Sequence, residues 1–211
     1  MTLPLEGMSV AILAADGVEQ LELEAPLDAA RRTGATVRVL APDARPLRTR
    51  QDGEPGDAVP VDLQLAQARV EELGALVIPG GAEAIRTLSA HADAVRLVRE
   101  VMELDRPVAA IAEGVSLLVA AGVVRGRTLA APSELRDELR AAGGTLSERS
   151  TAVDQHLLTA RSADDIRDFC AKLLDVLATV ATNAIVDEAS QESFPASDAP
   201  AWGPTRIGKD R

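Results

Sequence analysis

Four short apolar runs alternate with segments of helical periodicity, and no other feature of the sequence constrains the fold as strongly. The apolar runs are residues 8–14, 36–42, 75–81 and 107–114 (MSVAILA, TVRVLAP, ALVIPGG and PVAAIAEG). Runs of this length are typical of strands buried on both faces of a parallel sheet. Helical spacing is found in residues 21–34, 91–104, 114–122, 133–143 and 163–183. Because such strands are joined by right-handed crossovers, we predict an α/β fold with helices covering a mostly parallel central sheet.

Three segments depart from this alternation. Residues 43–62 are rich in Pro, Gly, Asp and Arg and indicate an irregular excursion or short hairpins, and residues 151–161 indicate a strand or a pair of strands. Residues 183–211 carry three prolines and no period. We therefore predict a compact domain over residues 1–182, followed by an irregular C-terminal extension that is either a tail or a clip held by Phe194 and Trp202.

Composition excludes several classes of function. The 211 residues suit one domain, and the formal net charge of −11 argues against a nucleic-acid or membrane-surface partner. No apolar stretch is long enough to span a bilayer, and the first residues make a poor secretory signal. One cysteine and two histidines favour neither a disulfide framework nor a metal site. We predict a cytoplasmic protein without metal or cofactor.

Ligands of open α/β sheets bind beyond the carboxyl ends of the strands. Three loops fall there: residues 15–20 (ADGVEQ), 79–81 (PGG) and 110–115 (AIAEGV). Together with their surroundings they form an ordered series of motifs: AILAADGVEQLELEAP, GDAVPVD, ALVIPGG, RPVAAIAEG, AGVVRGR and LTARSADDIRDFC.

From residue 8 to residue 177 this series resembles the DJ-1/PfpI superfamily, and more closely its PfpI-like bacterial branch. The resemblance implies a flavodoxin-like three-layer sandwich and a homo-oligomer, a dimer or higher. It also implies a nucleophile elbow after the fourth strand. At such a turn a side chain is held out near a helix N-terminus, where a thiol ionises readily.

Carried over onto this chain, the family's catalytic glutamate falls on Glu19, and the backbone of Gly80 and Gly81 matches the family's oxyanion donors. The family cysteine falls on Ala112 and its neighbouring histidine on Glu113. A methyl group cannot attack a carbonyl, and a glutamate is a poor substitute for imidazole at neutral pH. The departure argues against family-type thiol catalysis.

Other residues were weighed as replacements or additional site residues. Ser116 lies one turn beyond the elbow and should point elsewhere, and Cys170 should be a buried, inert packing residue. His91 and His156 are interpreted as surface residues, and Asp16 and Glu22 as solvated or capping groups. Two further positions stay open: Glu83 as an acidic residue following PGG, and Arg161 as a basic partner of Glu113.

Two hypotheses of function follow. The first is a non-catalytic family member, an oligomeric small-ligand-binding, stress-related, regulatory or structural protein. The second is a hydrolase-, lyase- or glyoxalase/deglycase-like enzyme of altered mechanism. In the second, Glu19 and Glu113 face one pocket, and like charges held close raise one pKa.

Overall fold

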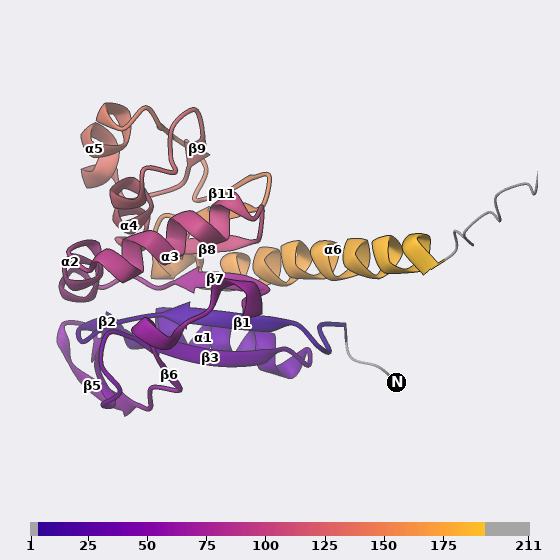
Figure 1. Cartoon of the computed structure of the whole chain (residues 1–211). Coiled ribbons are helices and arrows are strands. Elements are labelled where there is room, and N and C mark those ends of the chain that lie inside the picture. The colour runs from indigo at the N-terminus through magenta and orange to yellow at the C-terminus, as the bar shows by residue number, and fades with distance from the viewer. Residues whose placement is uncertain (1–3, 193–211) are drawn as a thin grey trace, which may run out of the picture.

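A seven-stranded sheet forms the centre of the molecule in the computed structural model, which describes residues 4–192 and the side chains of residues 4–182 (Figure 1). Its strand order is β11-β12-β8-β7-β1-β3-β6. The strands are β1 Ser9–Leu13, β3 Thr36–Ala41, β6 Leu63–Gln64, β7 Ala75–Ile78, β8 Val108–Ile111, β11 Thr151–Asp154 and β12 Leu157–Ala160. Neighbouring strands are parallel, except for the antiparallel pair β11 and β12. The predicted mostly parallel sheet is confirmed.

Six α-helices accompany the sheet within the described residues: α1 Gln20–Arg32, α2 Ala82–Ser89, α3 Ala92–Glu103, α4 Gly114–Ala121, α5 Arg136–Ala141 and α6 Ile166–Glu192. Helix α1 packs against α6, while α2, α3 and α4 pack against one another. Figure 1 shows the sheet between α1 and α3. The core between these layers is built from Ala, Val, Leu and Ile, with Phe169 as its largest side chain. This is the expected flavodoxin-like sandwich.

The excursion after β3 contains a hairpin, as predicted. Its strands are β4 Leu47–Gln51 and β5 Glu54–Val59, and β4 also pairs with the short strand β2 Val18–Glu19. Asp16 holds the hairpin against the first loop, because its carboxylate accepts the main-chain N–H of Arg48 at 2.9 Å and pairs with Arg45 at 2.8 Å. Asp16 is therefore a tethering group.

The remaining short elements lie on the periphery. They are the parallel pair β9 Thr128–Leu129 and β10 Thr145–Leu146, and single turns of 3-10 helix at Leu65–Gln67, Val70–Glu72, Ser133–Leu135 and Ala163–Asp165. Residues 151–161 form the predicted pair of strands, β11 and β12.

Helix α6 extends further than the sequence pattern indicated. It was expected to end at residue 183, but it continues to Glu192, into the segment expected to be irregular. No proline interrupts residues 183–192, and Ala, Glu and Gln there are good helix formers. Phe194 and Trp202 lie outside the described residues. Within residues 4–192 no helix has both the length and the apolar character needed to cross a bilayer.

Candidate functional site

The turn from β8 into α4 has the geometry of an elbow. Ala112 stands there with φ +50°, a left-handed conformation that costs a non-glycine residue about 1–2 kcal/mol. The turn is held from both sides. The Ala112 N–H donates to Ala160 O at 3.0 Å, and the Ala112 carbonyl accepts the N–H of Val115 at 3.3 Å. The predicted elbow is present, and it holds a methyl group that is only 6% exposed.

The Gly80–Gly81 loop after β7 lies against the elbow and against the first loop. A Cβ on Gly81 would lie 2.3 Å from the carbonyl oxygen of Gly17, and Gly81 has φ +106°. Both facts require glycine at this position. The Gly80 carbonyl also accepts the N–H of Glu19 at 3.3 Å. The loop thus brings the start of α1 to the elbow.

Glu22, on the first turn of α1, is buried in the site. Its side chain was expected to be solvated, and this expectation is wrong: the residue is 3% exposed, and its Oε2 accepts the N–H of Gly80 at 2.7 Å. The sequence did contain a signal. Glu22 shares the helical spacing of Pro26 and Ala30, the buried face of α1. A glutamate at such a position is nevertheless usually predicted to be solvated, because burying a carboxylate is costly.

Glu113 approaches the same loop from the other side. Its Oε2 accepts the N–H of Gly81 at 3.1 Å. A Cβ placed on Gly80 would lie 2.5 Å from Glu22 Oε2, 2.8 Å from Glu113 Oε2 and 3.0 Å from the Ala112 Cβ. Two carboxylate oxygens and the elbow methyl therefore converge on one point, and both expected oxyanion donors already hold a carboxylate of the chain itself.

The electrostatics follow from this crowding. Burial raises the pKa of Glu22 to about 7; the Gly80 hydrogen bond opposes this rise, and the charges of Glu113 and Glu19 add to it. Burial also raises the pKa of Glu19, with Glu113 and Asp52 acting in the same direction and Arg50 against them. At neutral pH the Glu22 carboxyl is therefore divided between its neutral and charged forms.

A cavity of about 520 Å³ opens in front of these groups. It is lined by Glu19, Glu22, Gly81, Ala82, Ala112, Glu113, Pro132, Ser133, Glu134, Arg161, Ser162 and Ala163. Four carboxylates and one guanidinium thus face the same space. The structure brings all five sequence-predicted site residues to this place, since Gly80 contacts the lining groups. It adds Glu22, Glu134 and the two serines, which sequence reasoning missed.

Arg161 lines the cavity, as its proposed pairing with Glu113 would require. The ion pair it makes is with Asp165 at 4.0 Å, and Glu113 instead accepts the Gly81 N–H. Glu83 lies outside this cavity, on the first turn of α2, and pairs with Arg50 at 3.6 Å. It stabilises the approach of the β4–β5 hairpin to α2.

The other weighed residues lie away from the elbow. Ser116 Oγ donates to Glu138 Oε2 at 3.4 Å and does not line the cavity, as expected. Cys170 is half-buried on α6, and burial raises the pKa of its thiol to about 11. His91, expected on the surface, is half-buried where α3 begins.

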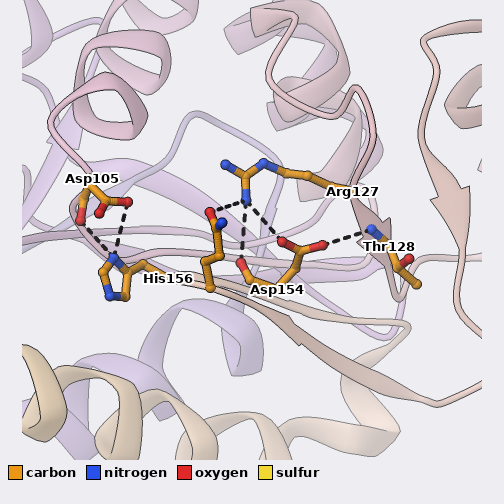
Figure 2. Close-up of polar contacts among 6 residues, drawn as sticks. Asp105, Arg127, Thr128, Asp154 and His156 are labelled. Carbon is orange, nitrogen blue, oxygen red and sulfur yellow. Dashed lines mark hydrogen bonds and ion pairs between the residues drawn. The ribbon is translucent and has the colours of Figure 1, made fainter.

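His156 contacts Asp105 at the opposite end of the sheet, beside a separate set of polar contacts around Asp154 (Figure 2). Its Nδ1 lies 2.9 Å from the main-chain oxygen of Asp105 and 3.3 Å from Oδ1 of the same residue. Beside it, Asp154 pairs with Arg127 at 3.2 Å and accepts the N–H of Thr128 at 3.1 Å. Asp154 thus has a guanidinium partner, and Asp105 has a histidine ring as its neighbour.

Metal binding finds no support in the described part of the chain. No group of three or more His, Cys, Asp or Glu side chains there is arranged to hold a metal ion. The carboxylates of the candidate site instead face main-chain N–H groups and one another.

Comparison with known proteins places this chain in a family. The profile of the DJ-1/PfpI family matches residues 8–176. An uncharacterized protein of Archaeoglobus fulgidus is 38% identical over 81% of this chain and 98% of its own length, and a deglycase of Thermococcus kodakarensis is 32% identical over 81% and 99%.

The solved structures agree with these relatives. A two-domain protein of Anabaena variabilis, containing DJ-1/ThiJ/PfpI-like and ferritin-like domains, superimposes with a TM-score of 0.76 at 27% identity. The match covers 81% of this chain and 48% of that one. A ThiJ/PfpI domain protein of Brachyspira murdochii, at 17% identity and a TM-score of 0.75, shares the fold over 82% of this chain and 98% of its own. With its sheet and its matching sequence, this chain belongs to the DJ-1/PfpI family.

Proposed function

We propose that this chain is a non-catalytic member of its family that binds a small ligand in the elbow cavity. One observation carries the proposal: the elbow presents the Ala112 methyl group, and the Gly80 and Gly81 N–H donors already hold Glu22 and Glu113. A nucleophile and a vacant oxyanion site are what acyl transfer and related chemistry require. Neither is present at this turn.

The charges around the cavity favour a particular class of ligand. Its lining offers carboxylate oxygens and serine hydroxyls, while its single guanidinium lies near Asp165. An anion would meet like charge and no free main-chain donor at the Gly80–Gly81 loop. A small cation or a donor-rich molecule, such as an amine or a guanidinium compound, would be attracted. We therefore include a positively charged ligand in the proposal.

The quaternary and cellular parts of the proposal rest on the family and on composition. We propose a cytoplasmic homo-oligomer, a dimer or higher. Sedimentation equilibrium tests the assembly state directly: a single species at the mass of one chain, 22.1 kDa, would contradict it.

Two variants test the absence of catalysis. The wild type is expected to show no turnover of methylglyoxal or of a peptide panel. The double variant Ala112→Cys/Glu113→His restores the missing groups, and turnover in that variant alone would support a disabled scaffold. Ala112→Ser/Glu113→His is the matched control, with the same imidazole and a weaker nucleophile. Wild-type turnover that disappears in Glu22→Gln would refute the proposal.

A second candidate function has a specific observation behind it. Burial raises the pKa of Glu22 to about 7, which suits a general acid or base, and a relative 32% identical is named a deglycase. In this reading the Glu22 carboxyl transfers a proton to a substrate held in the cavity. Wild-type activity that follows a single titration near pH 7, and is lost in Glu22→Gln but kept in Glu134→Gln, would favour the enzyme over the binding protein.

A further inference from the structure

A second cavity lies at the opposite end of the sheet from the elbow. It has a volume of about 670 Å³, between the β11–β12 turn and α6. It is lined by Asp105, Val153, Gln155, His156, Lys172, Asp175, Val176 and Thr179. Beyond Thr179 the helix continues to Glu192, and Figure 1 shows its end projecting past the sheet. We call this space the α6–β11 cavity.

Apolar side chains are unusually exposed around the α6–β11 cavity. Val153 in its wall is 48% exposed, and Leu104, next to the lining residue Asp105, is also 48% exposed. These are two of the three large apolar side chains that are exposed in the described part of the chain. Val153 therefore gives the cavity wall an exposed apolar side chain against which an apolar group of another segment could pack.

The charged side chains that line the cavity differ in how accessible they are to an incoming charged group. Lys172 is engaged by Asp168 at 2.6 Å and by Thr151. Asp105 contacts His156, but its side chain is 78% exposed, and Asp175 is also exposed. An occupant that carries positive charge would therefore find two accessible carboxylates.

The chain's own residues 193–211 fit these requirements. They contain Trp202, the single tryptophan of the sequence, and beyond it Arg206, Lys209 and Arg211 with only Asp210 opposing them. An indole buries about 150–250 Å² when it docks. The segment therefore offers the indole of Trp202, followed by a stretch of net positive charge that complements the exposed carboxylates of the cavity.

The reach of the chain selects Trp202 over Phe194. From Glu192 back to Thr179 the helix spans about 20 Å at 1.5 Å per residue. Trp202 lies ten residues beyond Glu192 and can extend about 33 Å, whereas Phe194 can extend only about 7 Å. Only Trp202 can return to the cavity along α6.

We propose that the segment around Trp202 docks into the α6–β11 cavity of its own chain, with the indole against Val153 and Val176 and the following basic residues near Asp105 and Asp175. Because the segment is tethered at Glu192, its effective concentration at the cavity is in the millimolar range or above, so a modest intrinsic affinity suffices. This inference is independent of the elbow site.

The fluorescence of Trp202 reports directly on whether the indole is docked. In the full-length folded chain its fluorescence emission is expected at shorter wavelength than in the urea-unfolded chain, with protection from acrylamide. Val153→Asp and, separately, Val176→Asp should each lower the docking constant about tenfold, equivalent to about 1.4 kcal/mol, and so move the emission part of the way toward that of the unfolded chain. Two variants on different elements guard against a folding defect, and circular dichroism verifies the fold of each.

Leu21→Asp is the matched control, because Leu21 is 53% exposed on α1 and lines a different cavity. It should leave the emission unchanged. Emission that already matches the unfolded chain, or that responds to Leu21→Asp but not to Val153→Asp, overturns the proposal. So does emission that shifts on dilution, because the segment would then dock on a second copy.

Discussion

Two groups of carboxylates, one beside the elbow and one at the opposite end of the sheet, differ in the partners they have. At the carboxyl ends of the strands, Glu22 and Glu113 lie on either side of Gly80 and accept the main-chain N–H groups of Gly80 and Gly81. At the amino ends, Asp154 is paired with Arg127, and Asp105 lies in hydrogen-bonding contact with His156 (Figure 2). Uncompensated buried charge lowers stability, whereas paired charge is neutral or mildly stabilising. The first arrangement is typical of a binding site and the second of a structural network.

The largest expected effect concerns the loop that brings the glutamates together. Gly81→Ala should destabilise the fold by about 3–5 kcal/mol, because it adds a strained φ to a backbone clash. Calorimetric unfolding measures the loss. Gly53→Ala is the control: its φ is +83° but nothing lies within 4 Å of the added Cβ, so strain alone costs about 1–2 kcal/mol. Equal losses in both variants would show that the close approach does not matter.

The second prediction removes the buried charge. The pKa of Glu22 is raised to about 7 in the folded state from 4.5. The folded protein therefore binds more protons than the unfolded chain between these values, and the stability that Glu22 contributes is lost as pH rises through 7. Glu22→Gln should abolish this slope and stabilise the protein at pH 8 by up to about 3 kcal/mol.

Chemical denaturation at several pH values measures this effect. Glu134→Gln, on the exposed side of the same cavity, serves as control and should leave the slope intact. If the free energy of unfolding of the wild type stayed constant from pH 5 to about 8, burial would not raise the pKa of Glu22 in the folded protein, and the prediction would be wrong.

The third prediction contrasts two thiol positions. Because burial raises the pKa of Cys170 to about 11, its reaction with a disulfide reagent at pH 8 should be about a hundredfold slower than that of a small thiol. In Ala112→Cys the new thiol lines the open elbow cavity and should react faster than Cys170. A fast wild-type reaction would place Cys170 among the reactive groups of the molecule.

The smallest effect is expected at the amino ends. Asp154→Asn breaks a half-exposed ion pair with Arg127 and weakens the contact to the Thr128 N–H, which should cost about 1 kcal/mol, less at high salt. The fully exposed pair of Asp28 and Arg32 is the control, and Asp28→Asn should change stability by less than about 0.5 kcal/mol. Glu22→Gln is expected to stabilise the protein. If Asp154→Asn stabilised it as well, the proposed difference between the elbow glutamates and the paired Asp154 would be wrong.

Much of the fold could be predicted because it depends on local pattern. The buried strands, the hairpin of residues 43–62 and the elbow at Ala112 each follow from apolar runs or turn residues that are contiguous in sequence. The end of α6 was misplaced because helix continuation depends on weak propensities that a polar composition obscures.

The burial of Glu22, unlike these elements, could not be predicted from local sequence pattern. Its helical spacing indicated the inner face of α1. The hydrogen bond that lowers the cost of burial comes from Gly80, in the loop after β7, which is far away in the sequence. The same holds for Glu113 and Gly81, which lie 32 residues apart. Contacts between residues so far apart in the sequence produce no local pattern from which they could be predicted.

The sequence by itself determined the parallel sheet, the family resemblance and the residue type at the elbow, since these are written in contiguous runs and motifs. Tertiary structure decided which carboxylates meet at the elbow, that both accept main-chain N–H groups, and that Asp154 meets Arg127 at the opposite end of the sheet. The physical reason is that hydrogen bonds and charge interactions act between atoms in space, so their energies are set only when the strands have been placed side by side.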